Sequence, residues 1–207
     1  LGKSGKEPYL AYKRKNEQFF LGGSVAIANQ IYQFNKKVTL LCNIKKNSLE
    51  EKFVNKKISD KFKIIPLDNF HENIVKTRYL EKVTNIKVFG CYDIDDLSYT
   101  KKQINNFLKL ISKLAKKNDM LVICDYGHGL INKELSSKIS KLKINKSLNT
   151  QLNAANIGAH NFQKYKNINF MIINEAELRY EMKDNVTKLD KLAKQMIKKI
   201  NINDLVV

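Results

Sequence analysis

The chain has 207 residues, of which 43% are hydrophobic, and this is enough to bury the core of one ordinary α/β domain over residues 1–207. The sequence has no run of about eighteen apolar residues and no signal-peptide pattern, so we expect a cytoplasmic protein without a membrane span. The net charge of +18 suggests binding to nucleic acid. However, arginine is the residue preferred for phosphate and base contacts, and only three of the 38 basic residues are arginine (Arg14, Arg78 and Arg179). We therefore expect no nucleic-acid partner.

The first half of the chain predicts short strands around two helices. Gly22 and Gly23 form a glycine turn that opens an apolar-periodic helix over residues 25–34. Alternating residues predict an edge strand over 9–14, and two further alternating segments predict an antiparallel, peripheral pair. The remaining expected elements are strands at 38–42 and 62–67, a polar helix at 49–58, and the peripheral strands at 73–81 and 86–92.

The second half alternates apolar runs with helical segments, which is typical of βαβ units and a parallel sheet. Residues 100–117 carry apolar side chains at helical spacing and predict the clearest helix of the chain. Strands are expected at 120–124, 144–149, 168–173 and from 205, with helices at 132–142, 156–165, 175–182 and 187–200.

Three of these expected strands end at polar residues: Asp125, Asn149 and Asn174. Because βαβ crossovers are nearly always right-handed, the strands point the same way and their carboxyl ends share one edge of the sheet. Open α/β sheets bind ligands at that edge. We therefore expect these three residues to be neighbours in a binding site.

Each polar cluster also has a purely structural explanation. Asp125 begins the sequence Asp-Tyr-Gly-His-Gly, which is an everyday turn as well as a loop that lets the backbone approach a ligand. Asn174 stands where a strand becomes a helix and Glu177 follows three residues later, which is the spacing of a capping box. Helix capping therefore competes with ligand binding as the role of Asn174 and Glu177.

The glycine pair and the cysteines carry weaker signals. Gly22 and Gly23 lack the spacing of dinucleotide-binding and Walker motifs. Asn29, further along the same helix, is either a ligand contact or a polar surface residue. The three cysteines are widely spaced within apolar residues, which predicts reduced core thiols and no disulfide or metal site; the histidines likewise form no zinc pattern.

Six segments taken together in order resemble the ribokinase-like carbohydrate kinases, also called the PfkB family. They are LGKSGKEP, FFLGGSVAIANQ, IVKTRYLE, VICDYGHGL, LNTQLNAANIG and IINEAELR. The sequence is most similar to the heptose phosphate kinase branch, whose members belong to lipopolysaccharide biosynthesis and also carry a nucleotidyltransferase domain. The resemblance implies a three-layer α/β fold with a mostly parallel central sheet, a small β lid, and magnesium-dependent transfer of phosphate from ATP to a sugar or sugar phosphate.

The resemblance also implies roles for individual residues on the acceptor side. Gly22 and Gly23 would line the sugar pocket, joined by Asn29 and by Asp125 at its strand end. The lid would comprise strands near residues 9–14 and 73–92. On it, Lys76 and Arg78 would face a sugar phosphate.

On the nucleotide side, the resemblance assigns three residues. Asn174 and Glu177 match the family's N-x-x-E motif, a magnesium and phosphate organising element, which makes Glu177 the candidate metal residue. Asn149 is assigned with them to ATP binding.

The sequence departs from the family in two ways. Ala26 replaces the asparagine that often follows the paired glycines in heptose kinases, and the G-A-G-D segment with the catalytic aspartate is absent. We therefore expect a truncated kinase domain without a catalytic residue, inactive as it stands, whose aspartate lies beyond Val207. The rival hypotheses are a noncatalytic sugar- or nucleotide-binding module and, from charge alone, a nucleic-acid binder. Edge strands in the lid also predict a possible homodimer.

Overall fold

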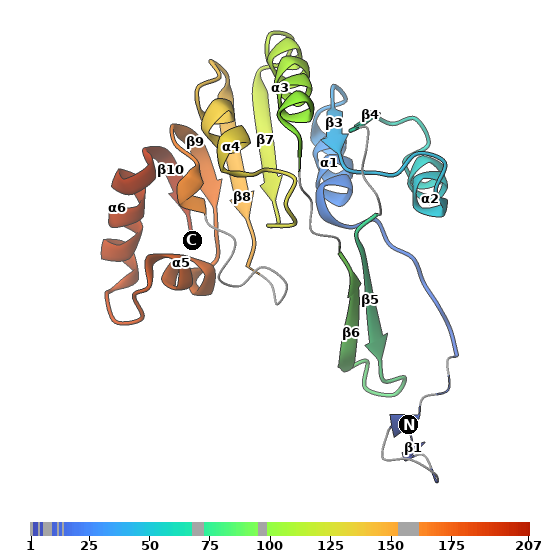
Figure 1. Ribbon diagram of the computed structural model, residues 1–207. Coiled ribbons are helices and arrows are strands. Elements are labelled where there is room, and N and C mark those ends of the chain that lie inside the picture. The colour runs from blue at the N-terminus through green and yellow to red at the C-terminus, as the bar shows by residue number, and fades with distance from the viewer. Residues whose placement is uncertain are drawn as a thin grey trace.

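The computed structural model describes residues 2–3, 5, 10–11, 13, 15–67, 73–94, 99–152 and 162–207. Its main feature is a four-stranded parallel sheet in the order β10-β9-β8-β7 (Figure 1). Because sequential strands are neighbours, right-handed crossovers place their connecting helices on one face. The elements of this half are α3 (Lys101–Ala115), β7 (Met120–Asp125), α4 (Lys133–Ser140), β8 (Asn145–Thr150), η1 (Phe162–Lys164), β9 (Ile168–Ile172), α5 (Glu175–Met182), α6 (Leu189–Ile200) and β10 (Ile202–Val206).

The first half of the chain forms a smaller parallel pair, β3-β4, which is not hydrogen-bonded to the four-stranded sheet. Leu41 of β3 nevertheless packs against the core of the larger sheet, so the two sheets share apolar contacts. The elements here are α1 (Gly23–Phe34), β3 (Thr39–Cys42), α2 (Leu49–Ile58) and β4 (Lys63–Pro66).

Side-chain caps determine where several helices begin. The Ser48 hydroxyl accepts a hydrogen bond from the Glu51 N–H at 3.0 Å, and the Asn132 side chain accepts one from the Leu135 N–H at 2.8 Å. These bonds satisfy backbone donors that the first turn of a helix leaves without partners. The predicted starts of α2 and α4 therefore agree with the structure to within one residue.

The main core lies between the four-stranded sheet and its helices. Leu148 and Met171 on the sheet and Leu178, Leu192 and Met196 on α5 and α6 are completely buried. Truncating a side chain of this kind to alanine typically costs about 2–5 kcal/mol. This packing holds the strand ends, and hence the candidate site, in place.

The lid is an antiparallel pair, β5 (Val75–Leu80) and β6 (Lys87–Asp93), that extends away from the sheet (Figure 1). Every residue of β6 is exposed, because no layer among the described residues covers either face. Cys91 is consequently exposed, and its prediction as a core thiol was wrong. Cys42 is buried as predicted, and both are free thiols.

Three predicted elements differ from the described structure. One is the strand expected from residue 205, which begins at Ile202 as β10. In the expected strand at 9–14, only the two-residue strand β2 (Leu10–Ala11) is present, and it pairs with β1 (Gly2–Lys3) instead of the lid hairpin. Tyr9, Tyr12 and Arg14 lie outside the described residues. In the helix expected at 156–165, residues 162–164 form a single 3-10 turn, and 156–161 lie outside the description.

Across the described residues, no helix is both long enough and apolar enough to span a bilayer.

Candidate functional site

The register of the parallel sheet brings the predicted strand-end residues to one edge. Asp125 is paired with Thr150, and Asn149 with Ile172, so the ends of β7, β8 and β9 lie side by side. Asn174 follows β9 directly. The sequence prediction that these residues share an edge is therefore confirmed by the strand pairing.

Asp125 is buried, with only 4% of its surface exposed, and its carboxylate interacts with neighbouring groups of the protein. Oδ1 accepts the Gly127 N–H at 3.1 Å, and Oδ2 accepts the Tyr165 hydroxyl at 2.7 Å. The Lys164 ammonium lies 2.6 Å from the same Oδ2. Burial, followed by the charge of Asp125, raises the pKa of Tyr165 well above 10, so Tyr165 remains a donor at neutral pH.

Asn174 and Glu177 form a complete capping box at the start of α5. The Asn174 side chain accepts the Glu177 N–H at 2.9 Å, and Glu177 Oε2 accepts the Asn174 N–H at 3.2 Å. Glu177 Oε1 also accepts the Leu152 N–H at 3.0 Å, which ties α5 to the segment after β8. The structural explanation of this motif is therefore confirmed, while a role in binding remains a prediction.

The glycine turn at the start of α1 lies next to the ring of Tyr126, the residue that follows β7 at the same sheet edge. Gly23 has a φ of +54°, and a Cβ placed there would lie 3.7 Å from the Tyr126 ring. A side chain at Gly23 is disfavoured mainly by this left-handed backbone rather than by crowding. The turn at the start of α1 therefore faces the loop that follows Asp125. Asn149 lies on β8, and its amide donates to the Ile172 carbonyl of the neighbouring strand β9 at 3.1 Å.

Two buried amide side chains lack partners in the described part of the chain. The side-chain oxygen of Asn29, on α1, is buried without a hydrogen bond. Both polar atoms of the Asn43 side chain, directly after β3, are also buried without one. The sequence prediction missed Asn43, although its signal was of the same kind: a polar residue at the carboxyl end of a parallel strand.

Replacing Asn43 with leucine is expected to raise the free energy of unfolding by about 1 kcal/mol, since a buried amide without partners costs desolvation energy. Urea denaturation followed by circular dichroism measures the change. Asn43→Ala is the matched control because it removes the amide but leaves a cavity. A loss of stability in Asn43→Leu would mean that the amide is satisfied in solution.

Lys76 and Arg78 remain apart from the strand-end residues. They lie on one face of β5, and the Lys76 ammonium sits 5.2 Å from the centre of the Tyr92 ring on β6. Burial and, secondarily, the charge of Arg78 lower the pKa of Lys76. The two cations share a face of β5, but none of the contacts described above joins them to the sheet edge, and their contact with a sugar phosphate remains a prediction.

Glu181 on α5 is a buried acid near the Lys164 ion pair. Its Oε1 has no hydrogen-bond partner in the described residues, and burial raises its pKa from 4.5 to about 7. The Phe162 backbone and the charges of Lys164 and Lys199 offset this effect only in part. A carboxyl whose pKa is raised by folding stabilises the fold fully below pH 4.5 and loses that contribution as the pH rises through about 7.

Glu181→Gln is therefore expected to be more stable than the parent at pH 8 by roughly 2 kcal/mol and nearly equal to it at pH 5. Chemical denaturation of both proteins between pH 5 and 8 measures this difference. Glu175→Gln, an exposed change on the same helix, is the control. A stability difference that does not vary with pH would contradict the prediction.

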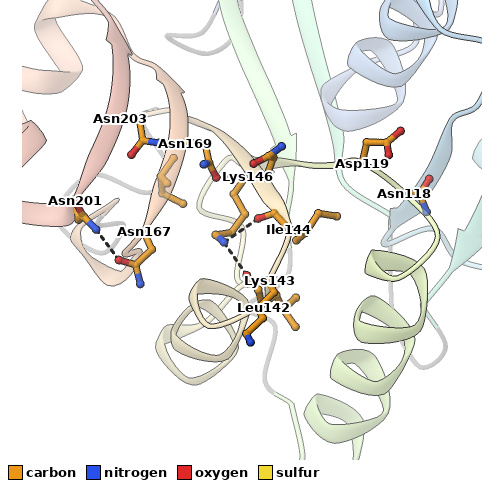
Figure 2. A pocket seen from close by; sticks show the side chains of 12 residues that line it. Asn118, Asp119, Leu142, Lys143, Ile144, Lys146, Asn167, Asn169, Asn201 and Asn203 are labelled. Carbon is orange, nitrogen blue, oxygen red and sulfur yellow. Dashed lines mark hydrogen bonds between the residues drawn. The ribbon is translucent and has the colours of Figure 1, made fainter.

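A separate hollow of about 490 Å³ lies at the opposite, amino end of the strands (Figure 2). Asparagines line much of it, and Asn167 and Asn201 have positive φ values of 56° and 57°. Asparagine suits such turns, so backbone geometry explains these two residues. The buried Lys146 ammonium donates to the carbonyls of Leu142 and Ile144 (Figure 2). This hollow does not coincide with the candidate site.

Two solved structures share the arrangement described above. The tetrameric inhibited form of phosphofructokinase-2 from Escherichia coli superposes with a TM-score of 0.65 and 12% identity, over 96% of this chain and 67% of that one. Phosphofructokinase-2 from Escherichia coli in complex with potassium gives 0.66 and 14%, over 97% and 66%. The chain has the fold of phosphofructokinase-2.

The predicted α/β, ribokinase-like fold with its mostly parallel sheet is thereby confirmed. No protein-family model and no curated protein matches the sequence. The chain spans about two thirds of the length of the two structures.

Proposed function

We propose that this chain is the larger part of a PfkB carbohydrate kinase domain, which transfers the γ-phosphoryl group of ATP to a hydroxyl of a sugar or sugar phosphate. The observation that carries the proposal is the shared edge of β7, β8 and β9, where Asp125, Asn149 and Asn174 stand at successive strand ends and the glycine turn faces Tyr126. Ligands of open α/β sheets bind at this edge. The fold, shared with two sugar-phosphate kinase structures, supports the same conclusion.

On the acceptor side, Gly22, Gly23 and Asn29 line the sugar pocket together with the loop that begins at Asp125. The proximity of Gly23 to the Tyr126 ring, 3.7 Å from a Cβ placed on the glycine, supports this assignment. Lys76 and Arg78 on the lid bind the phosphate of the acceptor, since a cationic point charge and a planar fork both suit phosphate oxygens. Closure of the lid over the edge brings these cations to the acceptor.

On the nucleotide side, Asn149, Asn174 and Glu177 organise ATP and Mg²⁺. No cluster of three acidic, cysteine or histidine side chains exists in the described residues. That is compatible with Mg²⁺, which commonly binds through one or two carboxylates together with waters and substrate phosphates. Each oxygen of Glu177 accepts one backbone N–H and has a second lone pair to offer. Bound Mg²⁺ would neutralise charge on the transferring phosphate.

The acceptor that we propose first is a heptose phosphate, from the resemblance of the six sequence segments. In the family that the six segments resemble, the catalytic aspartate that takes the proton of the acceptor hydroxyl belongs to a G-A-G-D segment, and the 207 residues contain none. The 207-residue chain is therefore inactive by itself.

A coupled kinase assay tests this proposal on the 207-residue chain and on a longer form that includes the G-A-G-D segment. We expect sugar-dependent ADP release from the longer form only, faster with a heptose phosphate than with a hexose phosphate. Turnover by the short form would overturn the assignment of the missing base. No sugar-dependent ADP release from the longer form with any sugar would contradict the kinase proposal.

A noncatalytic sugar- or nucleotide-binding module is the second candidate. It is favoured by the internal bonding of Asp125 and Glu177, whose carboxylates already serve the fold. Calorimetric binding of sugar phosphate or ATP by the longer form, without phosphate transfer, would support this alternative.

We also propose that a second copy of the chain covers the lid. Tyr79 and Phe89 stack with ring centres 4.2 Å apart, yet remain 41% and 46% exposed. An isolated two-stranded sheet is marginally stable in water, so this face gains stability from a partner. One of the structures with this fold is tetrameric.

Phe89→Lys is expected to convert the homodimer to a monomer, because a charged side chain in a self-associating apolar face is repeated in both copies. Sedimentation velocity measures the change. Val186→Lys, at an apolar residue 94% exposed far from the lid, is the matched control. A parent chain that sediments as a monomer at all concentrations would contradict the proposal.

A further inference from the structure

One ammonium group contacts both ends of the loop between β7 and α4, residues 126–132. Lys164 Nζ lies 2.6 Å from the carboxylate of Asp125, directly before the loop. The same nitrogen donates to the carbonyl of Ile131, next to the N-cap of α4, at 2.5 Å. A single side chain therefore holds the two ends of the loop at a fixed separation.

This contact is more buried than the Lys138–Glu134 and Arg179–Glu175 pairs. The Lys164 and Asp125 side chains are 14% and 4% exposed, whereas Lys138 and Glu134 are 40% and 47% exposed. Water screens the buried pair much less, so its geometry is retained at ordinary salt. Tyr165, which is fully buried, adds a hydroxyl donor to the same carboxylate oxygen at 2.7 Å.

The loop in turn carries the aromatic ring that faces the glycine turn. Gly127 and Gly129 have positive φ values of 69° and 86°, a backbone conformation that glycine adopts readily. Asp125 stabilises the conformation at the first glycine by accepting the Gly127 N–H. Tyr126 lies between Asp125 and Gly127, and its ring faces Gly23.

We propose that Lys164 and Tyr165 are positioning residues for the acceptor pocket: they anchor Asp125 and Ile131 and so hold Tyr126 against the glycine turn. The part of this inference that concerns the acceptor depends on the proposed function. Asp125 then acts through the loop, not by touching the substrate. Loss of the anchor weakens acceptor binding and leaves ATP binding unchanged, since Asn174 and Glu177 are held by their own capping box.

The first test follows Tyr126 directly in the 207-residue chain. With 3-fluorotyrosine incorporated, the ¹⁹F resonance of Tyr126 is assigned by its loss in Tyr126→Phe. We expect Lys164→Met to move and broaden this resonance and Lys164→Arg to restore it, because arginine again offers several donors. Lys138→Met, which removes an exposed lysine from α4, should leave it unchanged. A Tyr126 signal in Lys164→Met identical to that of the parent overturns the proposal.

Tyr165→Phe provides a second variant if Lys164→Met does not fold. It removes only one donor to Asp125, and exchange of the Gly127 amide hydrogen is expected to accelerate by about tenfold relative to amides of β9, as local opening requires. Equal acceleration throughout the sheet would show a loss of global stability and would count against a loop anchor.

The second test uses the longer form in the kinase assay. In Lys164→Met we expect the KM for the acceptor to rise by about tenfold or more, with the KM for ATP unchanged, because misplacement of a pocket wall affects the ligand that it contacts. A moved Tyr126 resonance with an unchanged acceptor KM overturns the role in the pocket. Absence of transfer by every form contradicts the proposed function instead, and the ¹⁹F signal still decides whether Lys164 holds the loop.

Discussion

Lys164→Met is expected to lower the free energy of unfolding by about 3–5 kcal/mol, the usual cost of removing one partner from a buried ion pair. Asp125 would keep the Tyr165 hydroxyl and the Gly127 N–H, but its buried negative charge would lose the Lys164 ammonium that lies 2.6 Å away. Urea denaturation monitored by circular dichroism gives the change in unfolding free energy and its midpoint.

Two further variants separate loss of the ion pair from loss of the lysine itself. Asp125→Asn combined with Lys164→Met removes both charges, and it is expected to recover most of the lost stability because no unpaired charge remains. Lys138→Met breaks an exposed pair with Glu134 and should cost less than about 1 kcal/mol. If Lys164→Met costs no more than Lys138→Met, the pair contributes nothing to the fold.

Glu177→Gln in the longer, active form is expected to lower kcat by roughly 10- to 100-fold and to raise the Mg²⁺ concentration needed for half activity, an effect typical of changes around a metal site. The amide keeps one oxygen acceptor but loses the negative charge, so α5 should remain folded while the affinity for Mg²⁺ falls. Steady-state rates over a range of Mg²⁺ concentrations measure both parameters.

Glu175→Gln is the matched control, because Glu175 belongs to the same first turn of α5 but forms an exposed pair with Arg179. It is expected to leave the dependence on Mg²⁺ unchanged. A lower melting temperature for Glu177→Gln, with rate and Mg²⁺ dependence as in the parent, would assign the motif to helix capping alone.

The linear order of secondary structure was predictable because it depends on local chemistry. Helix α2 begins at Leu49 after the Ser48 cap and ends at Ile58, as the sequence pattern predicts. The capping box of Asn174 and Glu177 was also predictable, since both partners lie within one turn. Strand-end residues such as Asp125 and Asn149 could be assigned to one edge from the crossover rule alone.

By itself, then, the sequence determined the order of helices and strands, because this order follows from hydrophobic periodicity and helix caps. It also determined that the strands run parallel and at which edge their polar end residues lie, because βαβ crossovers are right-handed. Only the tertiary structure decided what those polar residues contact. Lys164 and Tyr165 lie about 40 positions from Asp125 along the chain, and their hydrogen bonds to it exist only after β7 and η1 come together. The exposure of Cys91 likewise depends on how β6 is packed, since none of the described residues forms a layer behind this strand, and its apolar neighbours in sequence do not reveal this.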